Sequence, residues 1–134
     1  MANTADIVIV GGGVHGASTA WHLAKRGAGK IILIEKEGIA AGASGWSSAI
    51  VRMHYTLESL TRVAMYGREM FGDWNNIVGI GESGFREVGF LILFGAEEVP
   101  HAREIIAMQQ RLGIDARMVT PDEVGDIEPR PVRE

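Results

Sequence analysis

The chain has 134 residues, a formal net charge of −4, 46% apolar residues and no cysteine, and this is enough for one modest domain with its own core. The acidic balance excludes a basic face for nucleic acid, and the lack of cysteine excludes disulfides and cysteine-based metal sites. We predict no metal-binding residues. We expect a soluble cytoplasmic protein without a membrane span, because no apolar run is long enough to cross a bilayer and the N-terminus lacks a signal-peptide pattern.

The first expected element is a strand over residues 7–10 that enters a glycine turn. The β-branched residues of this run are typical of a buried parallel strand. They lead into a G-x-G-x-x-G turn formed by Gly11, Gly13 and Gly16. Gly11 allows the tight turn, Gly13 lets the backbone approach a ligand, and Gly16 lets the following helix pack closely. Backbone N–H groups and a helix dipole then converge where the pyrophosphate of a dinucleotide binds.

A helix and a second strand follow the turn. Residues 17–26 place small and apolar side chains on one helical face, and Gly27 and Gly29 end the helix. Residues 31–35 predict a short strand with Glu35 at its end, 19 residues after Gly16. This is the spacing of an acid that accepts hydrogen bonds from the ribose of adenosine. Taken alone, Glu35 would be a solvated charge, but together with the glycine turn it indicates ribose binding.

Residues 38–50 form a stretch of small side chains directly after Glu35 and Lys36. Such a stretch permits close backbone approach to a flat ligand, and its serines offer hydroxyl and N–H groups. The alternative is a flexible Gly/Ser linker, but Trp46 and the apolar residues that follow favour an ordered segment. The ligand-binding candidates in this stretch are Ser44, Ser47, Ser48 and Ile50.

The second half of the chain changes character. Residues 57–74 predict an amphipathic packing helix, and residues 85–94 predict a strand pair or one long strand bent at Gly89. A helix from about 97 or 99 to 112, capped by Gly113, precedes a short strand at 116–119. Thr120 and Pro121 then predict the N-cap and first residue of another helix, and residues 129–134 an extended tail.

The predicted fold class is α/β: a Rossmann-like FAD/NAD(P)-binding β-α-β unit followed by the start of an α+β substrate domain, an incomplete fold. We place the cofactor-binding portion at residues 1–78 and the truncated start of the substrate domain at 79–134, because the composition shifts near residues 75–84.

The runs 8–27, 32–36, 41–45 and 49–55 together resemble the N-terminal part of FAD-dependent oxidoreductases of the D-amino-acid oxidase and sarcosine oxidase group, which includes glycine-oxidase-like members. Residues 85–91 and 119–124 are similar to that group's substrate-domain strand and the turn after it. The resemblance covers almost the whole chain, but only about the first third of a typical member. It implies an extended FAD, with its pyrophosphate on residues 11–16, including Val14 and the backbone of His15. Its ribose would lie at Glu35 beside Lys36, and its ring system near residues 44–50.

The resemblance also implies an activity, which is oxidation of a C–N bond in an amine or amino acid by hydride transfer to the flavin. The flavin carries the chemistry, so no catalytic side chain is expected. Arg52 stands where sarcosine-oxidase-like members bind the substrate carboxylate, and a guanidinium can hold a carboxylate in a bidentate manner. The alternative, that Arg52 pairs with a domain carboxylate or a flavin phosphate, is equally open.

We expect the chain to be a fragment of a longer enzyme, or a subunit completed by a partner chain or a homo-oligomer. The alternative function is a non-catalytic nucleotide-binding fragment or subunit. A nicotinamide-dependent dehydrogenase is disfavoured, because a plain Rossmann domain does not need the small-residue loop after its second strand.

Overall fold

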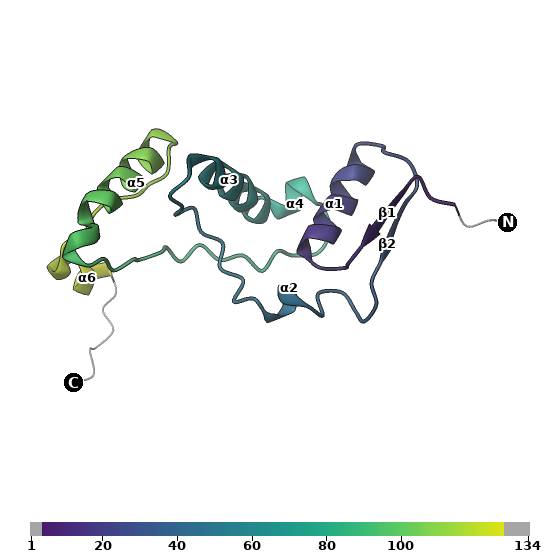
Figure 1. Cartoon of the computed structure of the whole chain (residues 1–134), viewed down its shortest axis with the longest axis horizontal. Helices are drawn as coiled ribbons and strands as arrows, with labels where there is room; N and C mark the ends of the chain where they lie inside the picture. The colour runs from purple at the N-terminus through teal and green to yellow at the C-terminus, as the bar shows by residue number, and fades with distance from the viewer. Residues whose placement is uncertain (1–3, 128–134) are drawn as a thin grey trace. The chain divides into compact units, whose positions relative to one another are not determined.

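The computed structural model describes residues 4–127 and contains two compact units, Met1–Ile50 and Val51–Glu134. The first unit is a β-α-β motif followed by a loop (Figure 1). Its elements are β1 (Ile7–Val10), α1 (Val14–Lys25), β2 (Ile31–Ile34) and the one-turn helix α2 (Ala43–Trp46). These elements confirm the predicted β-α-β unit, although α1 begins in the glycine turn itself, three residues before the predicted start.

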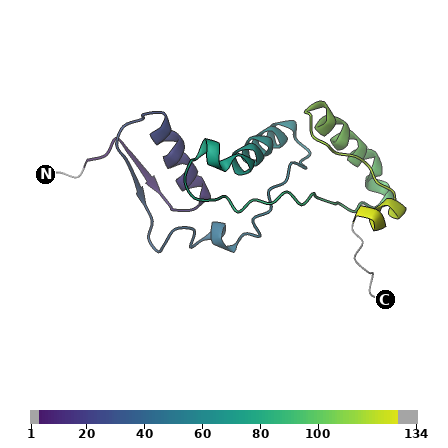
Figure 2. The same cartoon turned by 180° about the vertical axis from the view of Figure 1, so that it is seen from behind.

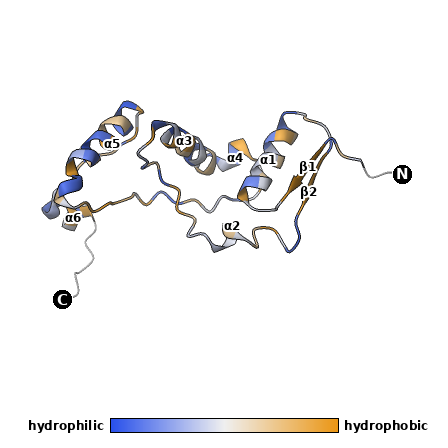
Figure 3. Cartoon of the chain, viewed as in Figure 1, coloured by the Kyte–Doolittle hydropathy of each residue, from blue (hydrophilic) through white to orange (hydrophobic). Residues whose placement is uncertain are grey.

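The two strands pair in parallel, with Ile7 opposite Ile31 and Val10 opposite Ile34. α1 joins the strands and packs on one face of the pair, as Figure 1 and its reverse view, Figure 2, both show. Figure 3 shows both strands in the colour of apolar residues. Because alternate side chains of a strand point to opposite faces, a second apolar face lies away from α1. On β1 this face holds Val8, 55% exposed, and Val10, 84% exposed.

The second unit is helical. Its elements are α3 (Glu58–Gly72), α4 (Trp74–Ile77), the 3-10 turn η1 (Ala96–Glu98), α5 (Val99–Arg111) and α6 (Pro121–Ile127). The buried face of α5 consists of Ala102, Ile105, Met108 and Gln109, and α3 packs beside α5 with Thr61 buried. The helices predicted at 57–74 and up to Leu112 are therefore confirmed, but the prediction that the apolar side of the first one is packed is wrong. Leu60 is 47%, Val63 69% and Tyr66 53% exposed, because within the described residues α3 packs mainly on α4 and α5.

The start of α6 follows the prediction from Thr120 and Pro121. The N–H of Thr120 donates to Glu123 Oε2 at 2.7 Å, and the N–H of Glu123 donates to Thr120 Oγ1 at 3.4 Å. This reciprocal pair is a capping box, which satisfies N–H groups that the helix itself cannot.

The strands predicted at 85–94 and 116–119 are wrong for the described residues, since both segments lie outside any strand of the structure. A strand needs a neighbour for its N–H and C=O groups, and the sheet described within residues 4–127 contains only β1 and β2. Gly89 does adopt a positive φ of 78°, consistent with the predicted bend. The start of a substrate-domain sheet and the domain boundary between 78 and 79 stay predictions, and the predicted tail at 129–134 lies outside the described residues.

None of the described helices is both long and apolar enough to cross a membrane.

Candidate cofactor site

The glycine turn joins the end of β1 to the start of α1. Gly11 has a φ of +107°, a conformation that side chains with a Cβ rarely adopt, and its N–H donates to the carbonyl of Ile34 at 2.8 Å. A Cβ added at Gly16 would stand 1.9 Å from the carbonyl oxygen of Gly11. The roles predicted for these two glycines, a tight turn and close helix packing, thus have a direct geometric basis.

Two side chains from later in the chain reach the N–H groups of this turn. The N–H of Gly12 donates to Glu35 Oε2 at 2.6 Å, and the N–H of Val14 donates to Ser44 Oγ at 2.9 Å. Val14 is the first residue of α1, so Ser44 accepts a bond from a helix N–H that has no partner within the helix. The structure therefore brings the predicted residues Glu35 and Ser44 to the predicted turn.

Backbone N–H groups determine the charge state of Glu35. The N–H of Gly12, and to a lesser degree that of Glu37 at 3.1 Å from Oε1, lower the pKa of Glu35 below its usual range. Bonds to a carboxylate stabilise its ionised form, so Glu35 is a charged acceptor at neutral pH. The neighbouring Lys36 is exposed, and its Nζ lies 3.2 Å from Glu37 Oε1.

The remaining predicted residues of this unit lie around the turn and after α2. The carbonyl of His15 accepts a bond from Thr19 Oγ1 at 2.7 Å. Ser47 Oγ accepts a bond from the N–H of Ala49 at 3.1 Å, which closes a local turn. Ser48 and Ile50 are exposed. The ligand contacts predicted for these residues stay predictions.

Arg52 belongs to the second unit and lies against two aromatic rings. Its Cζ is 5.4 Å from the centroid of the Tyr55 ring and 5.8 Å from that of Phe90, distances at which a guanidinium interacts with the face of a ring. None of the ion pairs within residues 4–127 involves Arg52. A carboxylate partner from the same chain is thus not found for Arg52 in the described residues.

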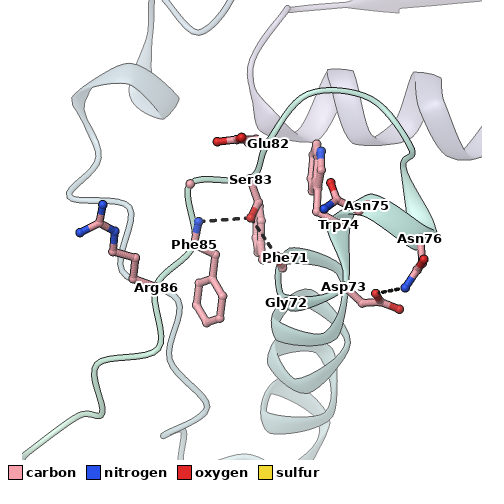
Figure 4. A pocket seen from close by; sticks show the side chains of 11 residues that line it. Phe71, Gly72, Asp73, Trp74, Asn75, Asn76, Glu82, Ser83, Phe85 and Arg86 are labelled. Carbon is pink, nitrogen blue, oxygen red and sulfur yellow. Dashed lines mark hydrogen bonds between the residues drawn. The ribbon is translucent and has the colours of Figure 1, made fainter.

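A separate pocket in the second unit lies between the end of α3, α4 and residues 82–86 (Figure 4). Phe71 and Trp74 stack with centroids 6.1 Å apart, and Ser83 Oγ donates to the carbonyl of Phe71 at 2.8 Å. None of the predicted cofactor-binding or substrate-binding residues lines this pocket.

The geometry of the first unit fits the ADP part of a dinucleotide. A Cβ at Gly13 would stand 3.0 Å from Ser44 Oγ, so a side chain there would crowd the hydroxyl that binds the N–H of Val14. Pyrophosphate can approach bare backbone at a helix N-terminus, and the carboxylate of Glu35 at the end of β2 suits ribose hydroxyls.

Comparison with known proteins identifies the family to which this chain belongs. A family model described as "FAD dependent oxidoreductase" matches residues 6–134. The chain belongs to this family. Its members depend on FAD, which confirms both the resemblance to flavin-dependent oxidoreductases and the expected cofactor.

Three known proteins show how much of a longer protein this chain matches. Sarcosine oxidase subunit beta from Arthrobacter sp is 29% identical over 135 residues, covering 92% of this chain and 31% of that protein. The mitochondrial pyruvate dehydrogenase phosphatase regulatory subunit of Mus musculus is 27% identical over 128 residues, covering 93% of this chain and 14% of that protein. The crystal structure of L-proline dehydrogenase from P. horikoshii matches with a TM-score of 0.83 and 29% identity, covering 96% of this chain and 34% of that one. The chain thus spans about a third or less of these proteins.

In this family member, Gly12 is a residue that the sequence motif did not single out. Its N–H binds Glu35, its carbonyl accepts the N–H of Ala40 at 3.0 Å, and an added Cβ would stand 2.9 Å from Ile39 Cδ1. Gly12 therefore ties both Glu35 and the following loop to the turn. The only signal in the sequence was a fourth glycine at a position the motif leaves variable.

Proposed function

We propose that this chain is the cofactor-binding N-terminal part of an FAD-dependent oxidoreductase that oxidises the C–N bond of an amine or amino acid of the sarcosine, D-amino-acid or glycine type. The observation that carries the proposal is the glycine turn at the N-terminus of α1 with the ionised Glu35 beside it. When bound, FAD supplies the acceptor for a hydride equivalent from the C–N bond.

The proposed roles follow the geometry of the first unit. The backbone of residues 11–16 cradles the pyrophosphate, with N–H groups and the positive end of α1 facing the phosphate charge. Glu35 accepts hydrogen bonds from the ribose, and Lys36 lies beside it. The loop residues Ser44, Ser47, Ser48 and Ile50 approach the flavin end.

Arg52 is proposed to bind the carboxylate of the substrate. The Arg52 guanidinium lies over the Tyr55 and Phe90 rings, and this contact holds its plane. The N–H groups at the edge of the guanidinium can still donate two parallel hydrogen bonds to a carboxylate. Two of the relatives are named for sarcosine and L-proline, and both compounds are carboxylates that carry a secondary amine. This shared chemistry favours an amino acid with a secondary amine as the substrate.

A binding titration tests the cofactor site. We expect FAD and ADP to bind the chain competitively and FMN, which lacks adenosine, to bind much more weakly. Glu35→Gln should weaken FAD and ADP alike, because it removes the charged ribose acceptor. The matched control is Glu37→Gln, whose carboxylate pairs with Lys36. Equal binding of FMN and FAD, or unchanged affinity in Glu35→Gln, would contradict the proposed site.

The whole protein is proposed to need more chain than is present here, supplied by a longer polypeptide, a partner or a second copy. The apolar face of β1 that lies away from α1 supports this, because exposed apolar sheet faces are normally covered. One relative is itself named as a subunit of sarcosine oxidase. A monomer of 14.5 kDa in native mass spectrometry and size-exclusion chromatography that holds FAD and also oxidises an amine by itself would refute it.

A non-catalytic role is the second candidate, favoured by the match to a protein named as a regulatory subunit. Anaerobic addition of sarcosine or L-proline to the FAD-loaded complete protein, with the remaining chain present, separates the two functions. Bleaching of the oxidised flavin absorbance supports the oxidoreductase, whereas an unchanged spectrum with FAD bound supports the regulatory role.

A further inference from the structure

Gln109 is a buried polar residue on the otherwise apolar face of α5. It is 3% exposed and lies among Ala102, Ile105 and Met108. A buried amide is stable only when its polar atoms have partners. The partners of Gln109 come from a distant part of the sequence, the segment that follows Arg52.

The amide nitrogen of Gln109 contacts two groups of this segment. Nε2 lies 3.1 Å from the carbonyl oxygen of Met53 and 3.2 Å from Nδ1 of His54. A carbonyl oxygen can only accept, so the group facing Met53 must be the NH2 of the amide. The same nitrogen has a second N–H and no acceptor, so Nδ1 of His54 must accept it. His54 is then a neutral imidazole that carries its proton on Nε2.

This contact holds the backbone next to Arg52. Met53 and His54 follow Arg52 directly, and the hydroxyl of the buried Thr61 approaches the carbonyl of Tyr55 at 3.5 Å and that of Leu57 at 3.3 Å. The segment is thus tied to α5 by Gln109 and to α3 by Thr61.

We propose that Gln109 is a positioning residue, whose amide fixes His54 as the Nε2–H form and holds the backbone that presents the Arg52 guanidinium over the Tyr55 and Phe90 rings. The importance of this placement rests on the proposed role of Arg52 in binding a substrate carboxylate. The contact itself is independent of that role.

Nuclear magnetic resonance of the full 134-residue chain tests the contact directly. A long-range 1H–15N spectrum should show the His54 proton on Nε2, and the Arg52 side-chain protons should carry the ring-current shifts of a guanidinium stacked on aromatic rings. Gln109→Met keeps the volume but removes both N–H donors, so most of the Arg52 shift should be lost.

The neighbouring Gln110 gives a matched control on the same helix. Its amide donates to the carbonyl of Ala116 at 2.8 Å, on the exposed side of α5. Gln110→Met should leave the His54 and Arg52 signals unchanged. A His54 proton on Nδ1 in the wild type, or an Arg52 shift that survives Gln109→Met, would overturn the proposal.

A second variant keeps the test decisive if Gln109→Met does not fold. In Gln109→Glu the ionised side chain has no N–H for the carbonyl of Met53, so that bond is lost, and Nδ1 of His54 must become the donor toward the carboxylate. The His54 pKa should rise by about one unit or more, because an adjacent carboxylate stabilises the imidazolium. An unchanged His54 titration in a folded Gln109→Glu chain would contradict the contact.

Calorimetric titration of the FAD-loaded complete protein with N-methylglycine separates the two proposals. If both proposals are right, Arg52→Met abolishes the binding of N-methylglycine. Gln109→Met then raises the Kd for N-methylglycine about tenfold, which corresponds to roughly 1.4 kcal/mol. If Arg52→Met leaves binding unchanged while the resonance results hold, the carboxylate role of Arg52 fails and the positioning by Gln109 stands.

Discussion

Replacing Gly16 by alanine tests the packing of α1 on β1. The added Cβ would stand 1.9 Å from the carbonyl oxygen of Gly11, well inside any normal carbon–oxygen contact. Neither atom can rotate away, because the oxygen is a backbone atom and the position of a Cβ is fixed by the backbone. The helix would have to move by more than about 1 Å, and overpacking of this kind costs about 1–3 kcal/mol or more. Alanine also favours a helix over glycine by about 1 kcal/mol. Because an approach of 1.9 Å lies at the severe end of this range, we expect a net loss of about 2 kcal/mol in the free energy of unfolding.

The matched control is Gly67→Ala in α3, where an added Cβ meets no atom within 4 Å. It should stabilise the protein by up to about 1 kcal/mol through helix propensity alone. Urea unfolding followed by circular dichroism measures both variants, and FAD titration measures whether the distorted turn still binds. If Gly16→Ala unfolds at the same urea concentration as the wild type and binds FAD equally well, then the close approach of α1 to the turn is not a feature of the protein in solution.

Three further predictions follow from individual contacts. The lowered pKa of Glu35 means that its ionised form stabilises the native state above about pH 4.5 and that this contribution is lost as the pH falls through the lower native pKa. As the pH is lowered from about pH 6 to about pH 3, the urea concentration at the midpoint of unfolding should therefore fall less steeply for Glu35→Gln than for the wild type. An equally steep fall in the two proteins would contradict this. Ser44→Ala removes the acceptor of the Val14 N–H and should lower the free energy of unfolding in urea by about 0.5–1 kcal/mol. Ser44→Thr keeps a hydroxyl, so if Ser44→Ala loses no more stability than Ser44→Thr, the bond does not stabilise the protein. Ile105→Ala, at a side chain only 6% exposed, should cost about 2–4 kcal/mol, against less than about 0.5 kcal/mol for Ile80→Ala, which is 71% exposed.

Local patterns predicted most of the elements. The β-branched run at 7–10, the glycine spacing and the acid at position 35 predicted the β-α-β unit and the place of Glu35, because a strand, a tight turn and a helix start depend on neighbouring residues. The capping residues Thr120 and Pro121 predicted the start of α6 for the same reason. The strands at 85–94 and 116–119 were wrong, because apolar alternation gives a segment the capacity to pair but not a partner.

Contacts between distant residues could not be predicted from spacing. The glycine motif assigned phosphate contacts to the turn, but it did not indicate that the N–H of Gly12 would donate to Glu35 or that Ser44 would reach Val14. Gln109 was missed altogether, although a glutamine on the apolar face of a predicted helix was a visible signal. Its partners lie 55 and 56 residues away.

The sequence by itself thus determined a glycine turn typical of dinucleotide binding, an acidic residue at the sequence spacing expected for ribose binding, and a family resemblance. These features depend on residue types at fixed short spacings. Only the tertiary structure decided which N–H groups Glu35 and Ser44 engage, and that a buried glutamine holds the segment carrying Arg52. The physical reason is that a hydrogen bond depends on distance and direction in space, and those are set by how helices and loops pack once the chain has folded.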